Sequence, residues 1–170
     1  MATPTHPAAL PREALLRACE VRRGRAGGPG GQNRNKVSTA VDLLHTATGV
    51  AGSASERRSQ EENLSVAVFR LRVTLALAVR MPYEPGAPPS ALWRSRLRSG
   101  RIALNPSHDD FPSMLAEALD VIAAMQFDLT KAAAVLACTI TQLVKLLKDE
   151  PRALAMVNEQ RRLRGLRVMK

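Results

Sequence analysis

The stretch VDLLHTATGVAGSAS, Val41–Ser55, decides the fold of the N-terminal half of the chain. Positions 41, 43 and 45 alternate with Asp42 and Leu44, which is typical of a strand with one buried face. The letters ATG then turn the chain into VAGSAS, so the two runs together predict a β-hairpin. Upstream, the segment REALLRACEVRR, residues 12–23, predicts a short helix that runs into a strand.

The segment after the hairpin, residues 59–79, carries two competing patterns. Every second residue from Phe69 to Val79 is apolar, as in a strand, whereas a stripe that begins at Leu64 has helical spacing. Length favours the helix, because about 20 residues is long for a strand. Ser59 followed by Glu62 also forms a capping box at the start of the segment. The first block of the chain is therefore predicted to be a small α+β domain.

Composition points to a polyanionic partner. The 170 residues are 45% hydrophobic, and the formal net charge is +10 with a pI near 10.9. Such an excess favours nucleic acid over an anionic membrane surface as the partner. Arg70 and Arg72 interrupt the longest apolar run, and the N-terminus does not have the pattern of a secretory signal. We therefore expect a cytoplasmic protein with no membrane contact, and we interpret Cys19 and Cys138 as buried thiols.

Charge and proline divide the chain into three parts. The net charge is +6 over residues 1–80, −1 over residues 81–127 and +5 over the remainder. The neutral part opens with MPYEPGAPPS, in which four prolines favour an extended and stiff spacer. The predicted division is therefore an α+β domain over residues 1–80, a Pro/Arg-rich linker over 81–107 and a helical C-terminal unit with a basic tail over 108–170.

The linker contains LWRSRLRSGR, in which Trp93 precedes four arginines. This pattern fits a segment that stacks on RNA and neutralises its phosphates. The alternative is a tryptophan that anchors the linker onto a domain while the arginines stay solvated, and it is favoured because alternating arginines are common on protein surfaces.

The last part of the chain is predicted to be all helix. Apolar stripes at Leu115, Ala133 and Leu143 mark three helices, and Pro151 sits where a first-turn proline begins a fourth. Short helices joined by tight turns resemble a helix-turn-helix. Such motifs often have glycine at the turn, where this chain has Ala137, so a plain helical bundle fits the pattern as well.

The glycine-rich segment Ala26–Lys36 holds the candidate chemistry. The three histidines are far from any candidate nucleophile, and no carboxylate pair is suggestively spaced, so a conventional active site is not expected. Gly30 and Gly31 have no side chain to block a close approach and can carry the backbone of Gln32 into a crowded pocket. A backbone N–H held there stabilises a developing oxyanion by about 2.7–4 kcal/mol.

A longer string surrounds this tripeptide. GPGGQ is followed by Asn35 and Lys36, then by STAV, by LLHTATG and by RRSQEEN at residues 57–63. Over residues 18–80 the sequence resembles the catalytic domain of class I peptide chain release factors. The resemblance implies that Gly30, Gly31 and Gln32 are catalytic, with the Gln32 backbone amide assisting the attack of water on the peptidyl-tRNA ester. It departs at Asn33, where many members have histidine, and at Arg57, where many have an acid.

The resemblance also bears on recruitment. Fewer than 20 residues precede the matched region and the C-terminal part does not resemble a codon reader, so the chain is most similar to short, codon-independent members that rescue stalled ribosomes. Some of these reach into the empty mRNA channel with a basic tail, a part that NEQRRLRGLRVMK could play. The RNA-binding candidates are Arg25, Arg34, Asn35, Lys36, Arg57, Arg58, Arg161, Arg162, Arg164, Arg167 and Lys170.

The function expected from the sequence is a codon-independent peptidyl-tRNA hydrolase that acts as a monomer. Its expected partners are peptidyl-tRNA and the ribosome, at the peptidyl-transferase centre and the rRNA of the large subunit, and it needs no metal or other cofactor. The alternatives are a catalytically silent ribosome-binding or RNA-binding factor and, from another class, a DNA-binding helix-turn-helix regulator.

Overall fold

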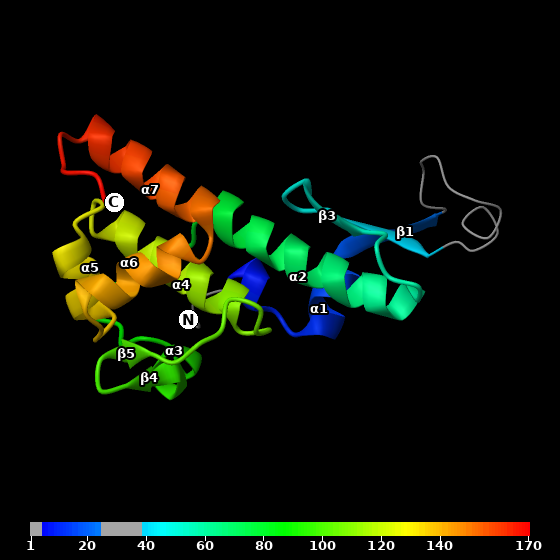
Figure 1. Ribbon diagram of the computed structural model, residues 1–170, viewed down its shortest axis with the longest axis horizontal. Coiled ribbons are helices and arrows are strands. Elements are labelled where there is room, and N and C mark those ends of the chain that lie inside the picture. The colour runs from blue at the N-terminus through cyan, green and yellow to red at the C-terminus, as the bar shows by residue number, and fades with distance from the viewer. Residues whose placement is uncertain (1–4, 25–38) are drawn as a thin grey trace. The chain divides into compact units, whose positions relative to one another are not determined.

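The computed structural model describes residues 5–24 and 39–170, and it divides the chain into two compact units (Figure 1). The N-terminal unit comprises Pro7–Val79. The C-terminal unit comprises Arg80–Lys170 together with the start of the chain. Helices and short antiparallel sheets occur together, so the predicted mixed α and β composition is confirmed.

The N-terminal unit contains a three-stranded antiparallel sheet in the order β1-β2-β3. Its elements are the 3-10 helix η1 (Pro7–Ala9), α1 (Arg12–Arg17), β1 (Cys19–Gly24), β2 (Ala40–His45), β3 (Val50–Ala54) and α2 (Gln60–Ala78). The central strand β2 buries positions 41, 43 and 45, as the alternation predicts. Gly49, with a φ of +70°, ends the turn that leads into β3, and its N–H donates to His45 O at 2.8 Å. The predicted hairpin is confirmed.

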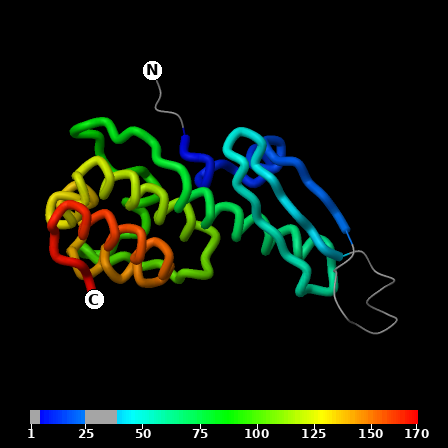
Figure 2. Tube along the Cα trace, turned by 90° about the horizontal axis from the view of Figure 1, so that it is seen from above, coloured from blue at the N-terminus to red at the C-terminus, as the bar shows by residue number. Residues whose placement is uncertain are grey.

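Helix α2 packs along the sheet, next to β3 (Figure 2). Its N-cap is the predicted one, because Ser59 Oγ accepts a 3.1 Å hydrogen bond from the Glu62 N–H. The buried side chains follow the helical stripe that begins at Leu64, so the helical interpretation of this segment is confirmed. The helix approaches the sheet most closely at Gly52, where a Cβ atom would lie 2.7 Å from Leu71 Cβ and 2.8 Å from Ala67 O.

The C-terminal unit is mainly helical. Its elements are α3 (Ala91–Arg96), β4 (Leu97–Arg98), β5 (Arg101–Ile102), α4 (Phe111–Ala124), α5 (Leu129–Val135), α6 (Ile140–Lys148) and α7 (Pro151–Leu163). The apolar residues of the predicted stripes form the core, with Leu115, Leu136 and Leu143 fully buried. Pro151 is the first residue of α7, as predicted. The free thiols are half-buried rather than buried, and desolvation raises the pKa of Cys138 to about 11.

The proline-rich start of the predicted linker, residues 81–90, is joined to α4 by hydrogen bonds at both of its ends. Asp120 accepts hydrogen bonds from the Met81 N–H at 3.0 Å and from Arg80 Nη1 at 3.1 Å, and burial raises the pKa of this carboxyl group to about 6. Glu117, one helical turn earlier, accepts from the Ser90 N–H at 2.7 Å and from the Ser90 hydroxyl at 2.5 Å. The segment therefore has contacts with the C-terminal unit that a free spacer lacks, and its role as a linker stays a prediction.

Trp93 belongs to the core of the C-terminal unit. Its side chain is fully buried, and its indole Nε1–H donates a 2.7 Å hydrogen bond to Leu136 O, at the end of α5. A buried indole cannot stack on RNA bases, so the proposed stacking of Trp93 on RNA is wrong. The anchoring interpretation holds instead, because this side chain fixes α3 to the turn between α5 and α6.

Replacement of Trp93 by phenylalanine is expected to destabilise the C-terminal unit. The variant leaves Leu136 O buried without its donor, which costs about 1–3 kcal/mol. In a domain of this size each kcal/mol lowers Tm by about 4–8 °C. Because Trp93 is the chain's one tryptophan, unfolding should be followed by circular dichroism. Arg94→Ala, an exposed neighbour, should change Tm little, and equal Tm values for the two variants would contradict the anchoring role.

The turn between α5 and α6 has the geometry of a helix-turn-helix. The two helices are bent by 100° relative to each other, within the range of about 90–120° found in such motifs. Ala137 has a φ of +51°, the conformation for which glycine is the usual residue. Alanine thus has the left-handed conformation at the position where such turns often have glycine.

Candidate functional site

The candidate tripeptide Gly30–Gln32 lies outside the described residues. So do four of the RNA-binding candidates, namely Arg25, Arg34, Asn35 and Lys36. The described residues on both sides of this segment belong to β1 and β2, whose register ends with the pair Gly24 and Ala40. Gly24 and Thr39, the described residues on either side of residues 25–38, therefore lie at one end of the sheet that α2 supports.

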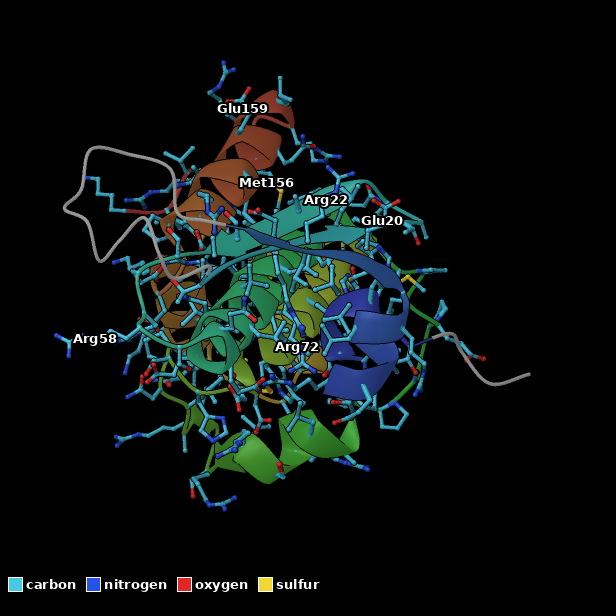
Figure 3. All side chains as sticks on the ribbon, turned by 90° about the vertical axis from the view of Figure 1, so that its right-hand side faces the viewer. Glu20, Arg22, Arg58, Arg72, Met156 and Glu159 are labelled. Carbon is cyan, nitrogen blue, oxygen red and sulfur yellow. The ribbon has the colours of Figure 1, made fainter. Side chains whose placement is uncertain are left out.

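Strand β1 forms one edge of that sheet and is largely exposed. Its side chains include Glu20 and Arg22, two residues apart on one face of the strand, with Arg22 Nη2 3.3 Å from Glu20 Oε2 (Figure 3). Both side chains are more than half exposed, so this ion pair contributes little to stability.

The backbone at Thr39 is held by a buried amide. Asn63 lies in the first turn of α2 and has no exposed surface. Its Nδ2 donates to Thr39 O at 2.7 Å and to Arg57 O at 3.0 Å, while its Oδ1 accepts from the Arg57 N–H at 2.9 Å. One side chain of α2 thus binds Thr39, which follows the candidate segment (residues 25–38), and Arg57, in the loop before α2.

Arg57 and Arg58 follow the sheet in the short loop before α2, and both are exposed. In Figure 3 the Arg58 side chain points away from the ribbon. Neither guanidinium makes a hydrogen bond or ion pair with another residue in the described part of the chain. Two cations are therefore presented to solvent in the loop whose backbone Asn63 holds.

The C-terminal candidates lie on and after α7. Arg161 Nε donates to Arg167 O at 2.9 Å, and its Nη1 donates to Phe127 O. The Arg164 guanidinium lies 4.5 Å from the centroid of the Phe127 ring, in a cation–π contact. Arg162 pairs with Glu159 at 2.7 Å, and this hydrogen bond lowers the pKa of the Glu159 carboxyl group.

The last residues fold back onto α7 instead of extending from it. Gly165, with a φ of +67°, reverses the chain. Asn158 then holds Met169 by two hydrogen bonds, from its Nδ2 to Met169 O at 3.0 Å and from the Met169 N–H to its Oδ1 at 2.8 Å. Arg167 and Lys170 are exposed in this turn-back, and their side chains make no hydrogen bond to the described residues.

Sequence reasoning assigned no role to Asn63. The residue ends the quoted string RRSQEEN, but a buried asparagine within a helix has no pattern of its own. Among residues 5–24 and 39–170 no group of three His, Cys, Asp or Glu side chains is placed to hold a metal ion. In the same ranges, no single helix has the length and apolar content needed to cross a membrane.

Comparison with known proteins gives one consistent result. Residues 16–97 match the model of the family described as RF-1 domain. The chain is similar to the chloroplastic peptide chain release factor PrfB1 of Arabidopsis thaliana, at 55% identity over 51 residues, and to the probable mitochondrial peptide chain release factor 1 of Caenorhabditis elegans, at 49% over 51 residues. Peptide chain release factor 1 of Chlorobaculum tepidum is 47% identical over 51 residues. These alignments cover 30% of this chain and only 11%, 13% and 14% of the three relatives.

Proposed function

We propose that this chain, whose residues 16–97 form an RF-1 domain of the class I peptide chain release factor family, hydrolyses the ester bond of peptidyl-tRNA on the ribosome. The observation that carries the proposal is the family match around an intact Gly30-Gly31-Gln32. The matched residues include all three strands of the sheet and α2, and the tripeptide lies in the sequence between β1 and β2.

The proposed chemistry is the attack of water on the ester carbonyl carbon. The backbone N–H of Gln32 stabilises the oxyanion of the tetrahedral intermediate. The intermediate then breaks its bond to the 3′-oxygen of the tRNA ribose, which takes up the proton that the attacking water gives up and leaves as a hydroxyl group. One such donor is typically worth about 2.7–4 kcal/mol of transition-state stabilisation. The chain's own contribution is thus a positioned backbone group, and the proposal includes no metal and no small cofactor.

We further infer that release is independent of the codon and takes place in the cytoplasm, on stalled ribosomes or large subunits. The inference extends the resemblance to short, codon-independent members of the family, and the C-terminal unit is a helical body with exposed cations that suit recruitment to RNA. Purified protein should release peptide from ribosomes stalled on an mRNA that is truncated before any stop codon. Release only with a stop codon in place would contradict the inference.

Recruitment is proposed to use basic residues of the C-terminal unit, which contact rRNA phosphates. Because Arg161 and Arg164 both contact Phe127, and Arg161 also bonds to Arg167 O, the clean test neutralises the other three candidates, Arg162, Arg167 and Lys170. Glutamine at these positions should weaken ribosome binding and reduce the slope of log K against log salt by up to about 0.7–0.9 per lost contact. Affinity should be measured at several salt concentrations.

A matched variant controls for the loss of charge as such. Arg98, Arg101 and Lys145 are three exposed cations of β4, β5 and α6, on another part of the same unit. Neutralisation of these three residues should leave the slope of log K against log salt closer to the wild-type value than neutralisation of Arg162, Arg167 and Lys170 does. A flattened slope for this variant alone would move recruitment to the hairpin and α6. At saturating protein both variants should release peptide at the wild-type rate, because neither touches the proposed catalytic segment.

A second candidate function is the binding of duplex DNA through α5 and α6. The 100° bend of this helix pair favours it, and Lys145 and Lys148 are exposed on α6. Sedimentation with ribosomes and binding to a DNA duplex, measured at one salt concentration, separate the two functions. A catalytically silent RNA-binding factor would bind ribosomes without releasing peptide.

A further inference from the structure

The side-chain amide of Asn63 is buried and is bonded to Thr39, the first described residue after the candidate segment, residues 25–38. It is fully buried, and both kinds of polar atom in it are used, in three hydrogen bonds of 2.7–3.0 Å. A buried amide that loses its partners is costly, so these contacts fix the side chain in one position. The same contacts also fix the two residues to which the partner atoms belong, Thr39 and Arg57.

The partners of Asn63 are all backbone atoms. Thr39 O is one of them, and Thr39 directly follows residues 25–38 and precedes β2. The other two are the N–H and the carbonyl oxygen of Arg57, which Asn63 pairs as a neighbouring strand would. The Asn63 amide therefore holds the backbones of Thr39 and Arg57 in position, whatever side chains these two residues carry.

Few side chains could make these contacts. The pattern needs two N–H donors and one acceptor on a short side chain, and asparagine supplies both. Aspartate has the same shape but no donor, and it would place a carboxylate against the carbonyl oxygens of Thr39 and Arg57. Leucine would leave these buried backbone groups unpaired.

We propose that Asn63 is a positioning residue for the hydrolysis, which it serves by holding Thr39 and Arg57 in place at the base of the segment that carries Gln32. This inference rests on the proposed function. At the other base of the segment, Gly24 is held by its strand pair with Ala40, whereas Thr39 is held by the Asn63 amide. Misplacement of a reacting group by about 1 Å can reduce a rate by about 10²-fold, so a loosened base lowers the rate of the chemical step.

The test variant is Asn63→Asp, and the matched control is Val73→Ala. Val73 is also buried in α2 but lies ten residues, or about 15 Å, further along the helix. Both variants remove stabilising contacts of the same helix, and only one touches the base of the segment. Single-turnover peptide release should be measured over a range of protein concentrations, well below the Tm of each variant.

Asn63→Asp is expected to lower the release rate at saturating protein by about 10–100-fold, with the half-saturating concentration changed by less than about twofold. Val73→Ala should lower Tm and leave the saturated rate at the wild-type value. Equal saturated rates for Asn63→Asp and the wild type would overturn the inference. The inference would also be overturned if Val73→Ala, compared at the same Tm, lost as much of its saturated release rate as Asn63→Asp.

Two additions keep the result interpretable. If Asn63→Asp does not fold, Asn63→Ser, which keeps one donor, should show an intermediate loss of the saturated rate, and a wild-type rate in this variant would overturn the inference. Hydrogen exchange of the Arg57 N–H should be slow in the wild type and faster in the Asn63 variants. A wild type that binds ribosomes but releases nothing contradicts the proposed function, whereas an active wild type with unaffected Asn63 variants contradicts the positioning role alone.

Discussion

Gly31→Ala is expected to abolish peptide release while leaving ribosome binding and thermal stability nearly unchanged. The proposed mechanism requires the backbone at Gly31 to approach the reacting ester closely, and a Cβ atom at this position would obstruct the approach. The loss should appear in the saturated single-turnover rate, measured with purified stalled complexes. Normal release by this variant would contradict the assignment of the tripeptide.

Two companion variants sharpen the result. Gly27→Ala makes the same substitution in the same segment but outside the tripeptide, and it should release peptide at close to the wild-type rate. Gln32→Ala retains the backbone N–H, so hydrolysis should fall less than in Gly31→Ala, although the preference for water over other nucleophiles should loosen. If Gln32→Ala were the more damaging variant, the side chain and not the amide would be the working group.

The second large effect is expected at Gly52, in the sheet of the N-terminal unit. An alanine Cβ at this position would lie 2.7 Å from the backbone N of Leu71 and 2.8 Å from Ala67 O, so α2 must move away from β3 to admit it. Overpacking of this kind costs about 1–3 kcal/mol and occasionally more, and contact with backbone atoms leaves no flexible side chain to yield. The corresponding loss in Tm is about 4–8 °C per kcal/mol for a unit of this size.

Gly24→Ala is the matched control for this variant. It introduces the same methyl group into the same sheet, but no atom of the described residues lies within 4 Å of the new Cβ. Denaturant unfolding should give a lower midpoint for Gly52→Ala and an unchanged one for Gly24→Ala. Equal midpoints would contradict the close packing of α2 on β3 as a requirement of the fold.

The elements that the sequence predicted are those with a local signal. The β2–β3 hairpin follows from strict alternation and a turn, and the start of α2 follows from Ser59, whose cap needs only the next three residues. Pro151 marked the first turn of α7 for the same reason. In each case the decisive physical interaction lies within a few residues of the chain.

The features that were missed depend on contacts between distant residues. The hairpin of β4 and β5 has strands of two residues, too short for a periodic pattern. Anchoring of Trp93 was one of two interpretations, but its hydrogen-bond partner Leu136 is 43 positions away and has no signal in the sequence. The turn-back of the C-terminus depends on the pairing of Asn158 with Met169. The arginine-rich sequences around these residues give no indication that Trp93 bonds to Leu136 or that Asn158 pairs with Met169.

The candidate site divides in the same way. The tripeptide was recognised from its resemblance to a family, because three small polar or flexible residues carry no pattern of hydropathy. The role of Asn63 became visible only when the fold brought Thr39 and Arg57 to the first turn of α2, from 24 and 6 residues away. The motif thus led to the proposed reacting group, and the fold led to the proposed positioning residue.

The most direct test of the central claim is a single-turnover release assay on ribosomes that carry a labelled peptidyl-tRNA and an mRNA truncated before any stop codon. The wild-type chain should release the peptide at a rate that saturates with protein concentration, and Gly31→Ala should occupy the same ribosomes without releasing it. Binding of the wild type with no release above that of Gly31→Ala would contradict the claim that this chain is a peptidyl-tRNA hydrolase.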